Sequence, residues 1–268
     1  MAALEAMWET EPAPAGLKLI AGINEAEQKN DWEVEIPYVM GLIGTRSLDK
    51  EIPGIHEIKA KNRDRVIRGI EAVKALEAIR KDRNDEGAKQ VFEQYKADLG
   101  FGLLLKKYTP DVTLATAAMI DAAARDTIPG VTPMFWTFRV MVGLGFWMLL
   151  LFSAALWFSI KGCFADRPWL LRAALWSLPL PWIACEVGWF VAEYGRQPWT
   201  IYGVLPTRLS VSTLSVESLY GSLAGFIGFY TVLLCVEMYL MVRFARQGPG
   251  SLGTGRYAGD SASLHLAH

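Results

Sequence analysis

Three long apolar runs constrain the fold of this chain more than any other feature of its sequence. They cover residues 134–160, 170–194 and 220–244. Each is long enough to cross the roughly 30 Å hydrocarbon core of a bilayer, which takes about 20 helical residues. All three are longer than the apolar core of a signal peptide and lie far from residue 1, so they are not targeting segments. The sequence therefore predicts an all-α membrane protein with three transmembrane helices.

The residues before the first run have a different character. Hydrophobic residues make up 52% of the chain, yet 21% of residues are charged. This composition fits neither a chain embedded throughout in a membrane nor an ordinary soluble domain, so the two characters must be segregated. Residues 1–130 are predicted to form one polar, mainly helical extramembrane domain, and 131–246 the transmembrane region. The net charge of −1 gives no reason to expect a nucleic-acid partner.

Apolar spacing gives an outline of the polar domain. Trp32, Val34 and Ile36 alternate with acidic residues, which predicts a short strand. Apolar residues at helical spacing predict helices over residues 2–10, 56–82, 87–106 and 111–126. In the second of these, the residues expected to face inward are Ile67, Ile70, Val73 and Leu76.

Cationic residues in the short loops predict the orientation. They gather between the first two runs and after the third: Lys161, Arg167, Arg172, Arg243, Arg246 and Arg256. Cytoplasmic loops carry such an excess, so the tail at 247–268 is expected in the cytoplasm and residues 1–130 on the outer face. No apolar segment precedes these polar residues to carry them across a membrane. We therefore expect further sequence upstream, either missing here or supplied by another chain.

Residues 188–199, Gly-Trp-Phe-Val-Ala-Glu-Tyr-Gly-Arg-Gln-Pro-Trp, place polar groups at the end of the second run. A carboxylate such as Glu193 costs several kcal/mol in a membrane unless something pairs with it, so a functional site is the default interpretation. Helical spacing puts Glu186, Trp189, Glu193 and Arg196 on one face. The alternative is an interfacial salt bridge between Glu193 and Arg196, with the tryptophans as interfacial anchors.

Cysteine and histidine offer little for a metal site. The cysteines lie in or beside apolar runs without CxxC spacing, so we expect small core residues rather than disulfides or metal ligands: Cys163, Cys185 and Cys235. None of the histidines falls within a predicted span: His56, His265 and His268.

The stretch at 188–199 resembles the signature of subunit I of the cytochrome bd quinol oxidases. The resemblance extends to the opening MAALEAMWETEPAP, to GLLLKKYTP at 102–110 and to Phe-Arg-Val-Met at 138–141, and so covers nearly the whole chain. The N-terminal half of the family has no counterpart here. The resemblance implies the C-terminal portion of subunit I, of the type with a long quinol loop, as a multi-pass protein of the bacterial cytoplasmic (inner) membrane.

The resemblance also implies roles for residues in the spans. Met141 is similar in position to an axial ligand of the low-spin haem b, and Glu193 to the ligand of the high-spin haem b. Arg139 and Arg196 would neutralise haem propionates, and Trp189 would lie beside the haem planes. The family's histidine ligands, including that of haem d, belong to the N-terminal half. From the residues alone, Met141 and Trp189 can equally be packing side chains.

Glu5 is similar in position to the functional glutamate of the family's quinol loop, where it would accept a proton from quinol. The implied reaction oxidises quinol at the outer face and passes electrons through haems to reduce dioxygen to water. Protons drawn from the cytoplasm would make it electrogenic. Implied partners are subunit II, the N-terminal half of subunit I, a small accessory subunit and membrane lipid. Glu186 and Glu237 can relay protons or simply hydrogen-bond across helices. The alternative function is a non-catalytic three-span scaffold or transporter fragment.

Overall fold

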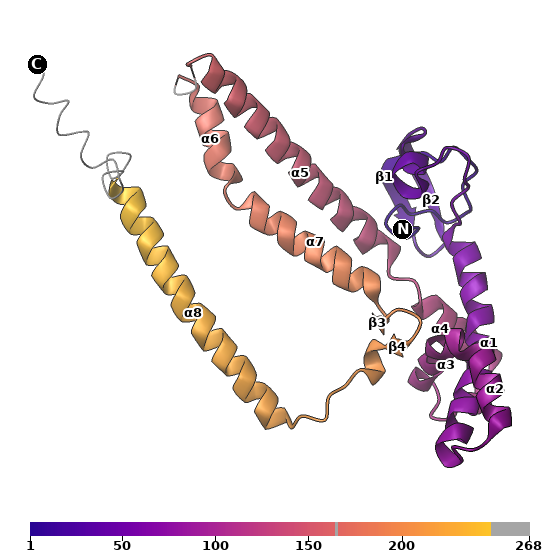
Figure 1. Ribbon diagram of the computed structural model, residues 1–268. Coiled ribbons are helices and arrows are strands. Elements are labelled where there is room, and N and C mark those ends of the chain that lie inside the picture. The colour runs from indigo at the N-terminus through magenta and orange to yellow at the C-terminus, as the bar shows by residue number, and fades with distance from the viewer. Residues whose placement is uncertain (164–165, 248–268) are drawn as a thin grey trace, which may run out of the picture. The chain divides into compact units, whose positions relative to one another are not determined.

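The computed structural model describes residues 1–163 and 166–247 (Figure 1). The chain divides into two compact units, Met1–Val211 and Ser212–His268. Most of the predicted cytoplasmic tail, including His265 and His268, lies outside the described residues.

A β-hairpin follows the opening segment. Strands β1 (Leu17–Asn24) and β2 (Lys29–Ile36) are antiparallel, with Ile20 opposite Val34. The strand expected at 32–36 is thus confirmed, whereas β1 was missed because its apolar residues do not alternate. The helix predicted over residues 2–10 is wrong. Residues 2–6 form turns, and Ala6 has a φ of 49°, a left-handed conformation that a helix does not continue through.

Four helices complete the polar region (Figure 1): α1 (Ile55–Lys81), α2 (Glu86–Tyr95), α3 (Leu99–Leu104) and α4 (Ala117–Asp126). The helix predicted over 56–82 is confirmed by α1 almost residue for residue. The single helix predicted over 87–106 is wrong, because a 3-10 turn at Lys96–Asp98 separates α2 from α3. Likewise the helix predicted over 111–126 is reduced to a 3-10 turn at Val112–Leu114 followed by α4. A short π-helix covers Gly41–Thr45.

Close packing of α1 on α3 sets the core of this region. Gly69 of α1 meets Gly102 of α3 so closely that a Cβ on Gly69 would lie 2.5 Å from the Asp98 carbonyl oxygen. This contact turns the small face of α1 inward, with Val66 and Val73 buried. Ile67 is instead 40% exposed, so its expected inward position is wrong. The cluster buried around this contact comprises Val66, Val73, Phe101, Leu104, Leu105, Val112, Ala123 and Trp199.

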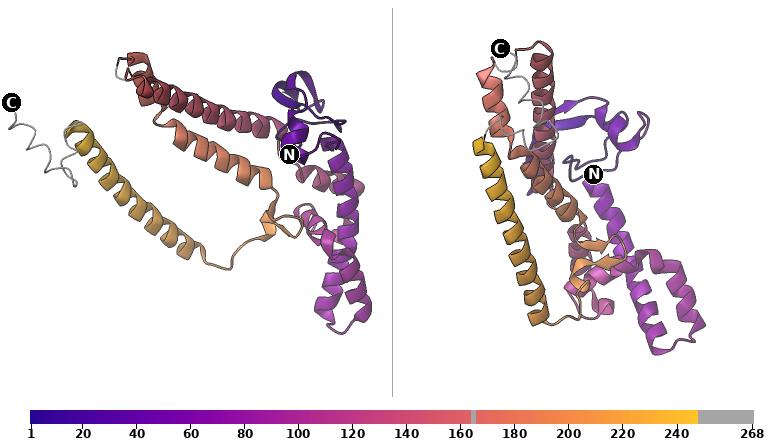
Figure 2. Two further views of the ribbon diagram at one scale, coloured as in Figure 1. Left: turned by 45° about the horizontal axis from the view of Figure 1, so that its top comes forward. Right: turned by 60° about the vertical axis from the view of Figure 1, so that its left-hand side comes forward.

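Among the described residues, three helical stretches are long and apolar enough to cross a membrane. The first is α5 (Val131–Ile160), which covers the predicted span at 134–160. The second predicted span is divided into α6 (Pro168–Ser177) and α7 (Leu180–Arg196), and α7 begins beside Pro179 and Pro181, the residues expected to kink it. Helices α5 and α7 lie side by side in both views of Figure 2. The third is α8 (Val216–Gln247), in the second unit.

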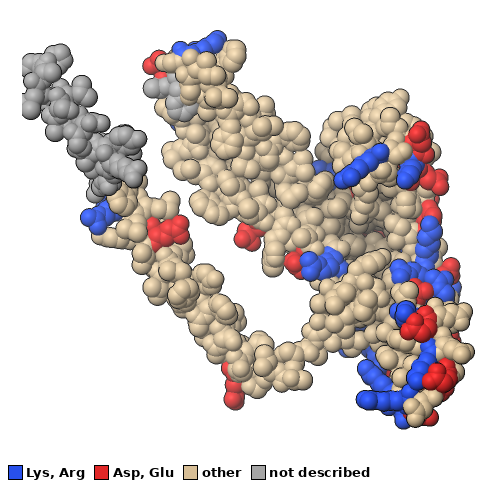
Figure 3. Space-filling view, viewed as in Figure 1, with Lys and Arg blue, Asp and Glu red and all other residues tan. Residues whose placement is uncertain are grey.

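The span helices expose large apolar side chains that a protein in water would bury. On α5 these include Leu150 and Phe152, each about two-thirds exposed. Figure 3 shows charges gathered over α1–α4, while the surface of α5–α7 is largely free of them. Such a surface must face lipid or another protein. Cys185 and Cys235 also lie exposed on α7 and α8, so the expectation that they are core residues is wrong for this chain.

After α7 the chain forms a small hairpin of β3 (Trp199–Ile201) and β4 (Leu205–Pro206), followed by a 3-10 turn at Thr207–Leu209. It packs against α3: the Gly100 amide donates to the Gly203 carbonyl, and Trp199 packs on Phe101 at 4.9 Å between ring centroids. The polar region and the end of α7 are therefore tied together.

Candidate functional site

A buried ion pair joins the opening segment to α5. Arg139 Nη2 lies 2.6 Å from Glu5 Oε2, and the two side chains are only 15% and 5% exposed. The guanidinium also stacks 3.5 Å over the Phe135 ring and donates to the carbonyl oxygens of Leu4 and Lys18. The family resemblance implies a role for Glu5 at the quinol and for Arg139 at a haem. The structure brings these two side chains into direct contact.

The surroundings of Glu5 favour its neutral form. Burial raises the pKa of the Glu5 carboxyl above its ordinary value, and the positive charge of Arg139 opposes this only in part. A carboxyl whose pKa is raised toward neutrality is better matched to accepting and releasing a proton near physiological pH.

A second buried cation supports the same segment. Lys18 Nζ of β1 lies 2.7 Å from Glu11 and 3.0 Å from Glu33. Asn30 donates to Glu33 at 2.8 Å and to the Ala6 carbonyl oxygen at 3.0 Å. The backbone on either side of Glu5 is therefore fixed by the hairpin. Sequence reasoning missed Lys18 and Asn30, since a strand at 17–24 was needed to place them.

An apolar cavity of about 420 Å³ lies beside the opening segment. Its walls come from residues 1–4, the start of α1, the turn before α5 and the last two turns of α7. Glu5 is not in the lining, although its neighbour Leu4 is. The lining residues are Met1, Ala2, Ala3, Leu4, Ile55, Ile58, Thr127, Ile128, Pro129, Met134, Val191, Ala192 and Gly195.

Met141 lies where α5 and α7 approach each other. A Cβ on Gly188 would sit 3.1 Å from the Met141 sulfur, and one on Gly195 would sit 2.7 Å from the terminal methyl of Met134. The two methionines are seven residues apart, as are the two glycines, so each methionine packs over one glycine of the antiparallel helix. The Met141 thioether is half-buried in a packing contact.

The polar stripe of α7 faces away from α5. Arg196 Nη2 lies 3.4 Å from Glu193 Oε1, with side chains 51% and 41% exposed, and Trp189 is 66% exposed. Helical spacing places Glu186, Trp189 and Glu193 more than a quarter-turn from Gly188, the contact with α5, and Arg196 about a quarter-turn from it. Met141 and Glu193 are therefore not brought together in this chain. The expected salt bridge between Glu193 and Arg196 forms, and about half of each side chain remains exposed.

The predicted haem-binding residues differ in how well they fit that group. Glu193, Arg196 and Trp189 present a carboxylate, a cation and an aromatic ring on one uncovered face, as an axial ligand with a propionate partner requires. Arg139 does not fit as a propionate partner, because each of its nitrogens already donates within this chain. Within residues 1–163 and 166–247, no group of three His, Cys, Asp or Glu residues could hold a metal ion. His56 lies in the polar region, 3.6 Å from Glu9.

Comparison with known proteins gives one consistent result. The model of the family described as cytochrome bd terminal oxidase subunit I matches residues 1–249. The chain is 42% identical over 94% of its length to cytochrome bd-II ubiquinol oxidase subunit 1 of Escherichia coli, covering 49% of that protein. It is 25% identical over 92% of its length to cytochrome bd ubiquinol oxidase subunit 1 of Bacillus subtilis, covering 41% of that protein.

The chain thus spans about half the length, or less, of the curated relatives that it matches. The match nevertheless includes the opening segment, all three candidate spans and the polar stripe of α7. On these grounds the chain belongs to the cytochrome bd terminal oxidase subunit I family.

Proposed function

We propose that this chain is the quinol-side, C-terminal half of subunit I in a cytochrome bd-type terminal oxidase. In that complex, quinol is oxidised at the outer face of the bacterial cytoplasmic membrane and dioxygen is reduced to water. Residues 1–130 form the quinol-loop domain on the outer face, residues 131–246 bind haem, and the tail at 247–268 is cytoplasmic. The activity belongs to the complex and not to this chain alone.

One observation supports the proposal more than any other: the contact between Glu5 and Arg139. The carboxyl expected to take a proton from quinol is held by an arginine two residues before Met141, the expected haem ligand on α5. We therefore place proton acceptance and electron acceptance within one turn of α5, on different faces of the helix. A short distance between the two is what coupled quinol oxidation requires.

The residues of this chain handle the proton as follows. Quinol loses two electrons and two protons as it becomes quinone. The Glu5 carboxyl accepts one proton, the second leaves to water at the outer face, and the haems of the complex would take the electrons. The raised pKa of Glu5 suits its proton transfer, and Arg139 fixes the carboxyl and stabilises its charged form before transfer. The positive charge of Arg139 limits how far burial raises the pKa of Glu5, so the protonated carboxyl can still release its proton to the outer face.

The uncovered face of α7 contributes the second set of roles. Haems, when bound, supply the one-electron acceptors and the centre that reduces dioxygen. Glu193 would hold the iron of the high-spin haem b, Arg196 would pair with one of its propionates, and the Trp189 side chain would pack beside it. Met141 is assigned as one ligand of the low-spin haem b, after a side-chain shift from its contact on Gly188.

Partners must complete what this chain leaves open. The N-terminal half of subunit I would bring the histidine ligands, including that of haem d, and would cover the exposed face of α7. Subunit II and a small accessory subunit would cover other apolar faces, and lipid the remainder. Protons drawn from the cytoplasm would make the reaction electrogenic. Glu186 and Glu237 would each either relay protons or hydrogen-bond across helices.

The test is quinol oxidation by membranes containing the complete complex with Glu5→Gln in this chain. Glu5→Gln should lower kcat at least tenfold while leaving haem absorption unchanged, because the amide keeps a hydrogen bond to Arg139 but accepts no proton. Glu51→Gln is the matched control, since Glu51 is an exposed glutamate of the same region. Unchanged kcat would remove Glu5 from the reaction. A complex without haem would favour the non-catalytic scaffold or transporter fragment.

A further inference from the structure

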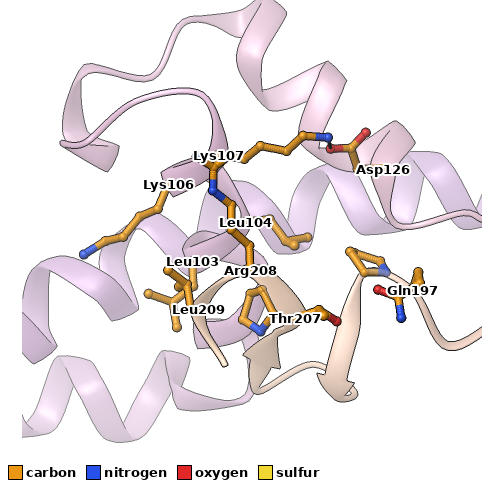
Figure 4. Close-up of a pocket in the computed structure, with 11 residues that line it drawn as sticks. Leu103, Leu104, Lys106, Lys107, Asp126, Gln197, Thr207, Arg208 and Leu209 are labelled. Carbon is orange, nitrogen blue, oxygen red and sulfur yellow. Dashed lines mark hydrogen bonds and ion pairs between the residues drawn. The ribbon is translucent and has the colours of Figure 1, made fainter. Parts of the chain in front are cut away.

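A second cavity, of about 310 Å³, lies in the polar region (Figure 4). Three parts of the chain form it: the end of α3 with the following 3-10 turn at Leu105–Lys107, the end of α4, and the residues on either side of the β3–β4 hairpin. It takes no part in the reaction proposed above. The lining residues are Leu103, Leu104, Lys106, Lys107, Asp126, Gln197, Pro198, Pro206, Thr207, Arg208 and Leu209.

The cavity is cationic. Lys106, Lys107 and Arg208 line it against a single carboxylate, Asp126. Lys107 Nζ lies 2.5 Å from Asp126 Oδ2, and Figure 4 draws this ion pair. Lys106 points the other way, toward Glu77, at 3.4 Å. Arg208 forms no ion pair with any residue in the described part of the chain. The cavity therefore holds an arginine whose charge is not compensated.

Apart from Gln197 and Thr207, the remaining lining is apolar, and it lies beside a membrane helix. Gln197 and Pro198 directly follow α7, a candidate membrane span, so the cavity opens at the level where that span ends. Leu103, Leu104 and Leu209 supply aliphatic surface next to Arg208. A cation beside aliphatic side chains at the end of a span matches the two halves of a lipid: a charged head group and acyl chains.

We propose that this cavity binds the phosphodiester head group of an anionic phospholipid of the surrounding leaflet. Arg208 forms the main charge contact, Lys107 the second, and the Thr207 hydroxyl donates to a phosphate oxygen. The planar guanidinium suits a phosphate, to which it can donate two parallel hydrogen bonds. The leucines take the first carbons of the acyl chains. This inference rests on the proposed membrane placement of α7 and does not depend on the oxidase reaction. The haem and kinetic tests above can therefore fail while lipid binding is confirmed, and lipid binding can fail while those tests succeed.

The test is native mass spectrometry of the complete complex taken from nanodiscs of phosphatidylglycerol and phosphatidylcholine in equal parts. We expect phosphatidylglycerol to be retained at least threefold over phosphatidylcholine, and Arg208→Gln to abolish this preference. Arg208→Lys should keep part of it. Arg83→Gln is the matched control, because Arg83 is exposed in the loop between α1 and α2 and lines no part of this cavity. Arg208 is itself exposed, so its replacement should not disturb folding.

Two results would overturn the proposal. One is equal retention of the two lipids, or a preference that survives Arg208→Gln. The other is displacement of phosphatidylglycerol by millimolar inorganic phosphate, which would make the cavity a site for soluble anions and not for lipid.

Discussion

The polar region and the membrane helices use the same apolar residue types in opposite ways. Around α1 and α3, Val66 and Phe101 are fully buried and the charges lie outside. On α5, Leu150 and Phe152 are about two-thirds exposed. The polar region has a hydrophobic core of its own, whereas the apolar side chains of the span helices are to be covered by lipid and by partner chains. Substitutions that act through internal contacts should therefore affect the polar region and its junction with α5 much more than the outward faces of the spans.

The largest expected effect falls on the junction between the two regions. Arg139→Gln leaves Glu5 buried without its cation, which should lower the free energy of unfolding by about 3 kcal/mol near neutral pH. The pKa of Glu5 is raised, so its carboxyl is charged only once the pH rises above that pKa. An unpaired buried carboxylate is costly only when it is charged, so the stability lost in the Arg139→Gln variant should be smaller under acidic conditions. Thermal unfolding in detergent at several pH values measures this.

Its control is Arg63→Gln, which breaks an ion pair with Asp121 in which both side chains are about half exposed. That change should cost less than about 1 kcal/mol. Equal losses for the two variants would mean that the Glu5–Arg139 pair is not a buried one.

The next effect compares two glycines. Gly69→Ala places a methyl group against the backbone of α3, which cannot yield as a side chain can, and should cost about 2 kcal/mol. Gly143→Ala on α5 meets no atom within 4 Å in this chain and should be neutral or slightly stabilising. Thermal midpoints of the two variants test the contrast directly. A large loss at Gly143 would place a closely packed partner on that face.

A smaller effect concerns Asp98, which is 8% exposed and receives hydrogen bonds from Arg65 at 2.6 Å and Arg68 at 2.7 Å. Burial opposes its charge, but the two arginines outweigh this and lower its pKa. The contacts of Asp98 with the two arginines therefore stabilise the fold fully above the ordinary carboxyl pKa. This contribution is lost as the pH falls through the lowered pKa of Asp98.

Asp98→Asn should cost about 1–2 kcal/mol at pH 7 and nothing once wild-type Asp98 is itself protonated. Unfolding followed between pH 7 and pH 3 would reveal this convergence. Asp49→Asn serves as the control, since Asp49 is exposed and forms no ion pair within the described residues. A cost that stays constant with pH would assign the effect to packing alone.

The smallest expected effect tests the position of the Met141 sulfur. Gly188→Ala pushes a methyl group to 3.1 Å from the Met141 sulfur, while alanine favours the helix by about 1 kcal/mol, so the net change in stability should be close to zero. If Met141 ligates the low-spin haem, as proposed, the absorption band of that haem should nevertheless shift, because the added methyl group displaces the Met141 sulfur. Gly145→Ala, which meets nothing within 4 Å, should leave the band in place.

Sequence reasoning predicted the helices and spans that follow from the spacing of apolar residues. It missed the features that depend on contacts between residues far apart in the chain. The spans and α1 follow from runs and spacing, and the break beside Pro179 follows from proline chemistry. The break between α2 and α3 was missed because Asp98 is held by two arginines of α1 that lie 33 and 30 residues earlier in the chain. The pairing of Glu5 with Arg139 spans 134 positions, and no local pattern signals it.

The most direct test of the account is the absorption spectrum of the complete complex carrying Glu193→Gln, beside Glu217→Gln as a matched glutamate on α8. If the uncovered stripe of α7 binds haem, Glu193→Gln should remove or shift the high-spin haem signal and leave the low-spin signal, while Glu217→Gln changes neither. An unchanged spectrum with full haem content in the Glu193→Gln complex would contradict the assignment, and with it the haem-binding role of this face.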